Sequence, residues 1–118
     1  MKNYISEGKF LTAVCSDPAT PASGDPVLIG TIPGVAVTDE GDGGNAATET
    51  TVCTKGIFDL SVKGVNAGGN AAVTVGAKVY YDTATTPKLG INASKVPFGY
   101  ALEAIDSGAT ATIKVLVK

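Results

Sequence analysis

Apolar and polar residues alternate with a period of two along much of the chain, as in a strand with one buried face. The alternation is clearest at residues 58–63, where Phe58, Leu60 and Val62 would share one face, and it returns at residues 110–117. Leu116 interrupts the polar face of the second segment, so we expect that strand to be covered on both sides or to offer a pairing edge. The other expected strands are short and rich in β-branched residues, at 4–5, 10–15, 26–29, 34–38, 50–54, 79–81 and 98–104.

Turn residues separate these segments about every ten residues, which is typical of a β-sandwich or barrel. Residues 17–24 and 83–87 predict turns, residues 39–45 a Gly-rich acidic tip, and residues 65–72 a loop or one short helical turn. We therefore predict an all-β fold, a small β-barrel or β-sandwich (tulip-like) with at most one short helix. The 118 residues fit a single domain, 1–118, with an N-terminal arm at 1–6.

Two parts of the chain repeat one arrangement: a turn glycine, a short apolar strand, a turn and a Gly-x-Ala strand. The first copy uses residues 24–30 and 34–37, and the second uses residues 76–82 and 99–102. Because the spacing inside the two copies differs, we interpret them as one β-hairpin used twice and not as a solenoid repeat. The small Gly-x-Ala segments would let a neighbouring strand or ring approach closely.

The composition removes most reactive chemistry. There is no His, and all 9 basic residues are Lys. Without His, catalytic triads and common zinc sites lose their usual member, and without Arg there is no bidentate grip on phosphate or guanine. The net charge of -2 gives no basic field for nucleic acid. We expect no enzyme activity, no catalytic residue, no cofactor, no metal and no nucleic-acid partner.

The sequence lacks the complete motifs of calcium loops, phosphate loops, membrane helices and signal peptides. Counted from Asp39, the third and fifth positions of a calcium loop are Gly41 and Gly43, which offer no side-chain ligand. No Gly-Lys-Ser/Thr follows the glycines of a phosphate loop. No apolar run reaches the 18 or so residues of a membrane helix, and charges at positions 7 and 9 interrupt a signal peptide. We expect no membrane partner.

Two cysteines and three tyrosines carry further expectations. Cys15 and Cys53 lie in apolar segments and are interpreted as buried reduced thiols, with a disulfide between them left open. Tyr80 and Tyr81 are adjacent, so a strand points them to opposite faces and one of them lies away from the core. The face carrying Tyr80 or Tyr81 with Tyr100 is the expected self-association surface.

The order of the turn-and-strand motifs is more specific than any single motif. In chain order they are Asn3-Tyr4-Ile5-Ser6-Glu7-Gly8, Ser23-Gly24-Asp25-Pro26-Val27, Gly34-Val35-Ala36-Val37-Thr38-Asp39, Thr54-Lys55-Gly56-Ile57-Phe58-Asp59-Leu60, Gly76-Ala77-Lys78-Val79-Tyr80-Tyr81-Asp82, Phe98-Gly99-Tyr100-Ala101-Leu102-Glu103-Ala104 and the closing run 111–117. This succession resembles the phage capsid cement (head decoration) proteins, a family once catalogued as a domain of unknown function, over nearly the whole chain. Two departures, Ala77-Lys78 in place of the more usual Asp and a longer tip at 39–45, concern loops.

The resemblance implies a non-enzymatic structural protein of a bacteriophage virion. Such proteins bind the major capsid protein on the capsid exterior, stabilise the head, and are usually homo-oligomers, most often trimers. The protein would be made in the cytoplasm of the bacterial host. The expected capsid contact is the N-terminal arm, which either adds a strand to a capsid sheet or pairs within its own sheet: Lys2, Asn3, Tyr4, Ile5 and Ser6.

Two other classes of function stay open at this stage. A small β-sandwich carbohydrate-binding or surface-adhesion module would show paired exposed aromatics around a groove. An enzyme subunit would need a hidden carboxylate pair, for which the candidates by elimination are Asp25, Asp59, Asp82, Glu103 and Asp106.

Overall fold

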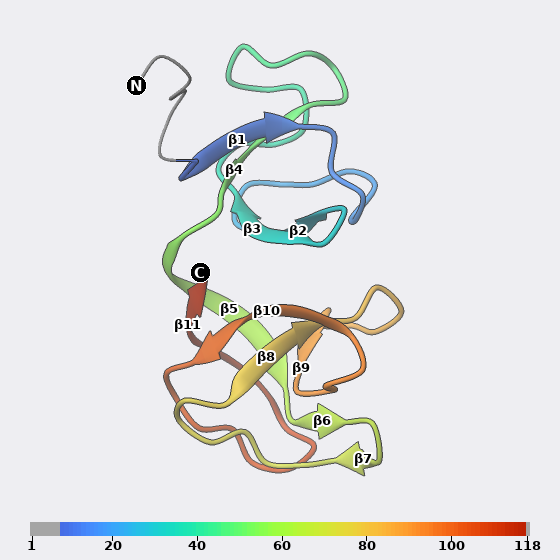
Figure 1. The fold of residues 1–118 in the computed structure, drawn as a ribbon, viewed down its shortest axis with the longest axis vertical. Coiled ribbons are helices and arrows are strands. Elements are labelled where there is room, and N and C mark those ends of the chain that lie inside the picture. The colour runs from blue at the N-terminus through green and yellow to red at the C-terminus, as the bar shows by residue number, and fades with distance from the viewer. Residues whose placement is uncertain (1–7, 118) are drawn as a thin grey trace, which may run out of the picture.

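The structure is a computed structural model that describes residues 8–117. Every regular element in this range is a strand, and the strands form two lobes joined end to end (Figure 1). The predicted all-β fold with a small barrel is therefore confirmed, and the described residues form no helix. In particular, residues 8–117 include no helix able to span a membrane.

The N-terminal lobe is a four-stranded antiparallel sheet in the order β1-β4-β3-β2. Its strands are β1 (Phe10–Ala13), β2 (Pro26–Ile29), β3 (Ile32–Ala36) and β4 (Thr50–Cys53). After β1 the chain curls back onto the edge of β2, where Leu28 N donates to Asp17 O at 2.9 Å. The lobe's own core is a cluster of four buried apolar residues, Cys15, Val27, Ala36 and Val52. A cluster of that size gives little stability by itself, so the lobe depends on what covers it.

The C-terminal lobe is a closed five-stranded barrel in the order β10-β11-β5-β9-β8. Its strands are β5 (Gly56–Lys63), β8 (Lys78–Tyr81), β9 (Leu89–Gly90), β10 (Val96–Ala101) and β11 (Thr110–Val117). The last strand pairs with β10 on one side and with β5 on the other. The predicted pairing edge at the C-terminus is therefore wrong, because β11 lies between β10 and β5 in the sheet. Although β11 has a neighbouring strand on each edge, its outward face is not buried, and Lys114 on that face is exposed.

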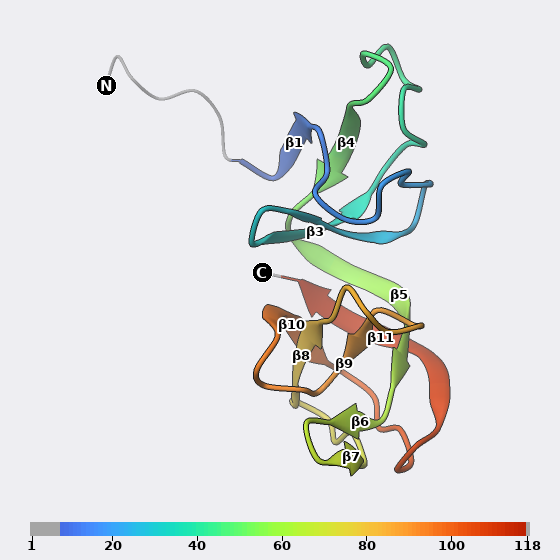
Figure 2. The same cartoon turned by 90° about the vertical axis from the view of Figure 1, so that its right-hand side faces the viewer.

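Residues 65–72 form neither a helical turn nor an irregular loop. They make a small hairpin of β6 (Val65–Asn66) and β7 (Gly69–Asn70) at the end of the barrel farthest from the N-terminal lobe (Figure 2). Gly69 takes a φ of 122°, which only glycine adopts readily. The Asn and Gly residues that suggested a loop therefore supply a tight turn between two very short strands.

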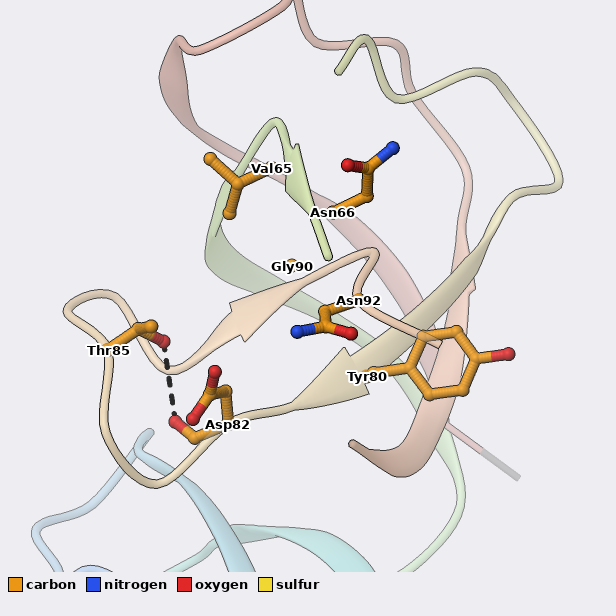
Figure 3. A pocket seen from close by; sticks show the side chains of 7 residues that line it. All are labelled: Val65, Asn66, Tyr80, Asp82, Thr85, Gly90 and Asn92. Atoms are coloured by element: carbon orange, nitrogen blue, oxygen red, sulfur yellow. Dashed lines mark hydrogen bonds between the residues drawn. The ribbon is translucent and has the colours of Figure 1, made fainter. Parts of the chain in front are cut away.

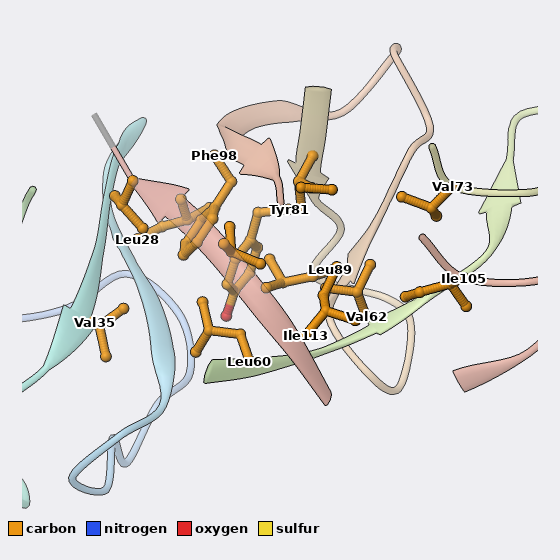
Figure 4. Close-up of a cluster of buried hydrophobic side chains, with 14 residues drawn as sticks. Leu28, Val35, Leu60, Val62, Val73, Tyr81, Leu89, Phe98, Ile105 and Ile113 are labelled. Atoms are coloured by element: carbon orange, nitrogen blue, oxygen red, sulfur yellow. The ribbon is translucent and has the colours of Figure 1, made fainter. Parts of the chain in front are cut away.

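One hydrophobic cluster fills the barrel and extends into the N-terminal lobe (Figure 4). Leu28 of β2 and Val35 of β3 are 3% and 4% exposed and pack against barrel residues. The other buried members are Leu60, Val62, Val73, Val79, Tyr81, Leu89, Phe98, Ala101, Ile105, Ile113, Val115 and Val117. The barrel thus supplies the apolar cover that the N-terminal lobe lacks.

The two lobes are built on the same plan. The strand order β1-β4-β3-β2 of the N-terminal lobe corresponds to β5-β11-β10-β8 of the barrel. The hairpin of β2 and β3 matches the hairpin of β8 and β10 pair by pair. In order, the corresponding pairs are Pro26–Val35 and Lys78–Tyr100, Val27–Gly34 and Val79–Gly99, Leu28–Pro33 and Tyr80–Pro97, and Ile29–Ile32 and Tyr81–Val96. Phe98 is the one extra residue, because it sits in a bulge between Pro97 and Gly99.

The correspondence continues into the outer strands and the turns. The pairing of β1 with β4 matches the pairing of β5 with β11. In order, the corresponding pairs are Phe10–Cys53 and Ile57–Leu116, Leu11–Val52 and Phe58–Val115, Thr12–Thr51 and Asp59–Lys114, and Ala13–Thr50 and Leu60–Ile113. Before each hairpin, a glycine amide donates to an alanine carbonyl, Gly24 N to Ala36 O at 2.8 Å and Gly76 N to Ala101 O at 2.7 Å. The predicted repeated hairpin is confirmed and extends to four strands in each lobe.

The Gly-x-Ala segments also behave as predicted. A Cβ on Gly34 would lie 2.3 Å from Val52 Cγ1 and 2.9 Å from the Cys53 carbonyl oxygen. A Cβ on Gly99 would lie 2.2 Å from the Leu116 carbonyl oxygen. Each glycine therefore lets the adjacent strand, β4 or β11, approach at a distance that no side chain permits.

The lobes differ at one place that shapes the molecule. A two-residue turn joins β2 to β3, whereas a long connection, residues 82–95, joins β8 to β10. Within this connection β9 pairs with β8 and β5 and closes the barrel. The same connection carries Lys88 to the N-terminal lobe, where its ammonium lies 3.1 Å from Asp17 Oδ2.

Candidate functional site

The hollow in Figure 3 is the natural place to look for catalytic or metal chemistry, because polar side chains gather there. Its lining residues are Val65, Asn66, Tyr80, Asp82, Thr85, Gly90 and Asn92. The oxygens that could act on a ligand are engaged in local turns, with Asp82 Oδ1 accepting from Ala84 N at 2.9 Å and Asn92 Oδ1 accepting from Ser94 N at 3.1 Å. These groups shape the 82–95 connection.

Metal ligands do not gather in the part of the chain that the structure describes. No group of three Asp, Glu or Cys side chains there is placed to hold a cation. Asp59 and Glu103, two of the carboxylates considered for an enzyme, both face the ammonium of Lys114, at 3.4 Å and 3.9 Å. These three side chains are exposed on the outer face of the barrel and read as a solvated charge cluster.

The joint between the lobes holds the one strongly perturbed polar group among residues 8–117. Tyr81 is 1% exposed, and its hydroxyl donates to Asp17 Oδ2 at 2.5 Å and lies 3.4 Å from the Pro26 carbonyl. Burial, followed by the hydrogen bond to Asp17, raises the pKa of Tyr81 well above its ordinary value. Lys88 contacts the same carboxylate oxygen. A residue from each lobe and one from the barrel-closing connection therefore meet at this point, which fixes how the lobes are placed.

The predicted self-association face is partly rearranged by the structure. Tyr81 lies in the core, so it drops out of that face, and the expectation that one of the two adjacent tyrosines lies away from the core is met by Tyr80. Tyr80 and Tyr100 are half-buried on the outer face of the barrel. Because Tyr100 pairs with Lys78, and Lys78 stands two residues before Tyr80, the three side chains share this face. The Lys78 ammonium lies 5.9 Å from the centroid of the Tyr80 ring.

Apolar side chains are exposed near the neck between the lobes. Phe10 and Ile57, which occupy equivalent positions in the two lobes, are 55% and 60% exposed. Ile32 is 45% exposed and, with Pro33, Thr54 and Lys55, lines an open hollow of about 460 Å³ at one end of the N-terminal lobe. Contiguous exposed apolar surface, such as the lining of this hollow by Ile32 and Pro33, is typical of sites that contact other proteins.

The predicted capsid contacts, Lys2, Asn3, Tyr4, Ile5 and Ser6, lie outside the described residues. The chain enters the structure beside the neck, where Thr54 N donates to Lys9 O at 2.7 Å. The exposed Lys9 ammonium lies 5.4 Å from the centroid of the Phe10 ring. The first described residues thus belong to the same end of the N-terminal lobe as Thr54 and Lys55.

The two cysteines are free thiols in separate surroundings. Cys15 belongs to the small core of the N-terminal lobe, where burial raises the pKa of its thiol. Cys53 is also buried, and its Sγ donates to the Lys55 carbonyl at 3.1 Å. The side chain of Thr50 is fully buried, and its hydroxyl lies within hydrogen-bonding reach of the Cys15 thiol.

Sequence reasoning missed the joint completely. The sequence predicts only a turn at Asp17 and nothing particular at Lys88, because neither residue stands in a recognisable spacing with Tyr81. Tyr81 takes the position of Ile29 in the other copy of the repeated hairpin, but the sequence leaves open which of Tyr80 and Tyr81 points inward.

The fold defines a class of protein: a small all-β protein of two lobes with a tightly fixed joint, and with exposed apolar positions on its surface. Residues 5–118 match the family model described as phage cement protein, and the chain belongs to this family. A search of the curated proteins and a search of the solved structures found no match. Membership assigns the chain a structural, capsid-binding role in the phage virion, in a family that is not known for enzymes.

Proposed function

We propose that this protein binds the outer surface of a phage capsid and stabilises the head. The observation that carries the proposal is the family match over residues 5–118. The structure adds physical support, since most of the chain forms two rigid β lobes tied by the contact of Tyr81 and Lys88 with Asp17. A rigid body loses little conformational entropy when it binds, which favours a role as a mechanical brace. The partner is the major capsid protein, and the protein itself is no enzyme.

The N-terminal residues 2–6 are the proposed capsid contact, and self-association is proposed through Tyr80 and Tyr100. The homo-oligomer is a trimer. A trimer offers three copies of each contact, and simultaneous engagement multiplies the effective affinity by about 10²–10⁴ over a single contact. Modest contacts at each capsid subunit are therefore sufficient. In this proposal the two lobes act as one domain, because the cluster containing Leu28 and Val35 spans both.

The carbohydrate-binding alternative gains no support from the hollows of the barrel. It needs aromatic rings paired around one groove, whereas Tyr80 and Tyr100 line different hollows. Tyr80 shares its hollow with amide side chains, and Tyr100 shares its own with Pro97 and Lys78.

Co-sedimentation with purified heads that lack decoration tests the proposal. We expect the full chain to sediment with mature heads and to saturate at a fixed number of copies per capsid subunit. A variant lacking residues 1–6 should fold normally and bind at least tenfold more weakly. Absence of saturable binding by the full chain would overturn the capsid-binding proposal. Unchanged binding by the truncated chain would overturn only the arm contact.

A further inference from the structure

The outer edge of β5 is paired over only part of its length. The strand runs from the neck along the barrel (Figure 2), with β11 on one side and β9 on the other. All eight residues of β5 pair with β11, but β9 pairs with β5 only at Val62, through Leu89. No other strand within residues 8–117 pairs with this edge. Residues 56–61 therefore form a sheet edge that is open to a further strand.

The ladder between β5 and β11 shows which backbone groups point out of this edge. Gly64 N donates to Ala109 O at 2.9 Å, and these two residues continue the register of the pair. Bonded and non-bonded pairs alternate along an antiparallel ladder, so Ile57 and Asp59 turn their N–H and C=O groups away from β11. The side chain of Ile57 is 60% exposed and that of Asp59 is 67% exposed. This part of the edge therefore lies at the surface.

The barrel-closing connection shows that the edge accepts a strand and why pairing stops. Leu89 lies parallel against Val62 and is only 1% exposed. Pro87 comes two residues before Leu89 and has no N–H to donate, so the ladder cannot continue past it towards the neck. The edge of β5 therefore changes from paired to unpaired beside Ser61.

A hollow opens where this pairing ends, at the joint of the two lobes. Its volume is about 260 Å³, below the range of about 300–1,000 Å³ that small-molecule pockets occupy. It therefore suits one side chain of a larger partner. Three prolines and polar groups from both lobes line it: Pro18, Asp25, Pro26, Ser61, Tyr81, Pro87 and Lys88.

The charges around the hollow favour a basic side chain. The carboxylate of Asp17 is already bound by the Tyr81 hydroxyl and the Lys88 ammonium. Asp25 makes no ion pair within residues 8–117, and its Oδ2 accepts from Ala22 N at 3.0 Å. Two carboxylates against one ammonium leave an excess of negative charge, which a lysine or arginine of the partner would balance.

We infer that an extended segment of the major capsid protein adds as a strand to β5 at Ile57 and Asp59 and places a basic side chain in the hollow beside Asp25. Main-chain hydrogen bonds along the edge give affinity, and the hollow selects the side chain. This inference rests on the proposed capsid binding and gives it a second contact, separate from residues 2–6.

Binding of variants to undecorated mature heads, measured by co-sedimentation, tests the strand addition. Asp59→Pro removes the outward N–H at a place where an edge strand tolerates proline. Asp59→Ala is its matched control, because it loses the same carboxylate and keeps the N–H. We expect Asp59→Pro to bind heads at least about tenfold more weakly than Asp59→Ala.

A second pair of variants tests the charge in the hollow. Asp25→Asn removes the charge and keeps an oxygen that can accept from Ala22 N. It should bind heads about three- to tenfold more weakly at low salt, with a smaller difference at high salt. Asp42→Asn makes the same change at an exposed position outside the hollow and should bind as the wild type does.

Hydrogen exchange locates the contact without any substitution. The amides of Ile57 and Asp59 should exchange rapidly in the free protein and at least about tenfold more slowly on heads. Slow exchange of both amides in the free protein would overturn the inference, because the edge would then be paired by the protein itself.

The outcomes separate this contact from the proposed function. Equal head binding by folded Asp59→Pro and Asp59→Ala would overturn the strand addition and leave capsid binding intact. Wild-type binding by Asp25→Asn would overturn the basic side chain in the hollow. Failure of the wild type to bind heads would instead overturn the proposed function, and this contact with it.

Discussion

The hydroxyl of Tyr81 should hold the two lobes together, and Tyr81→Phe removes that hydroxyl alone. The ring keeps its place against Phe98, while Asp17 loses the hydrogen bond at 2.5 Å and keeps its ion pair with Lys88. A hydrogen bond to a charged group contributes about 1.5–3 kcal/mol when it is buried. We therefore expect the free energy of unfolding to fall by about 2 kcal/mol at pH 7.

The alkaline range gives the same hydroxyl a second signature. The pKa of Tyr81 is raised in the folded state by burial and by Asp17, so the folded protein keeps this proton while the unfolded chain releases it near pH 10. The stability from this group is therefore complete below about pH 10 and is lost as the pH rises above it. Between pH 9 and 11 the wild type should lose more stability than Tyr81→Phe does.

Urea denaturation followed by far-ultraviolet circular dichroism measures both effects. Tyr80→Phe is the matched control, because the neighbouring ring lies on the outer face and a surface substitution usually changes stability by less than about 0.5 kcal/mol. Equal unfolding midpoints for Tyr81→Phe and Tyr80→Phe at pH 7 would refute the assigned role of the joint. Parallel pH profiles for Tyr81→Phe and the wild type would refute the link to the tyrosine proton.

Three further predictions concern the packing. Gly99→Ala should destabilise the protein by at least about 2 kcal/mol because its Cβ would meet the backbone of β11. Gly68→Ala is the control and should change the stability little, because the atom nearest to its Cβ is a side-chain oxygen at 3.5 Å. Equal urea midpoints for the two variants would contradict this prediction. Thr50→Val should change the free energy of unfolding by less than about 1 kcal/mol, since the buried hydroxyl that it removes has the weakly hydrogen-bonding Cys15 thiol as its partner, and a loss of more than about 2 kcal/mol would count against it. Cys15 and Cys53 should react slowly with a thiol reagent at pH 8 in the native protein, and completely once the protein is denatured without a reducing agent. Two cysteines that stay unreactive after denaturation would indicate a disulfide.

Local patterns in the sequence predict the strands well because period-two alternation and turn residues act over a few positions. Strands β2, β4 and β5 lie close to their expected ranges, and the Gly-x-Ala segments identify the two places of closest strand approach. The repeated hairpin is visible for the same reason, since its turn glycine and its small residues meet steric demands that the lobes share.

Long-range contacts could not be read in the same way. Barrel closure through the short strand β9 leaves only two residues of signal, Leu89 and Gly90. The pairing of β11 with both β10 and β5 likewise depends on residues distant in the chain. The joint of Asp17, Tyr81 and Lys88 joins residues far apart in the chain with no characteristic spacing. Equivalent positions of the lobes also differ in chemistry, Leu28 against Tyr80 for example, because Leu28 is buried and Tyr80 is half-buried.

Release of packaged DNA from heated heads tests the central claim most directly. Undecorated mature heads are mixed with increasing amounts of the protein, and the temperature at which DNA becomes accessible to a fluorescent dye is recorded. We predict that the release temperature rises with occupancy and levels off when the binding sites are filled. A release temperature that stays constant while the protein is bound at saturation would contradict a stabilising role.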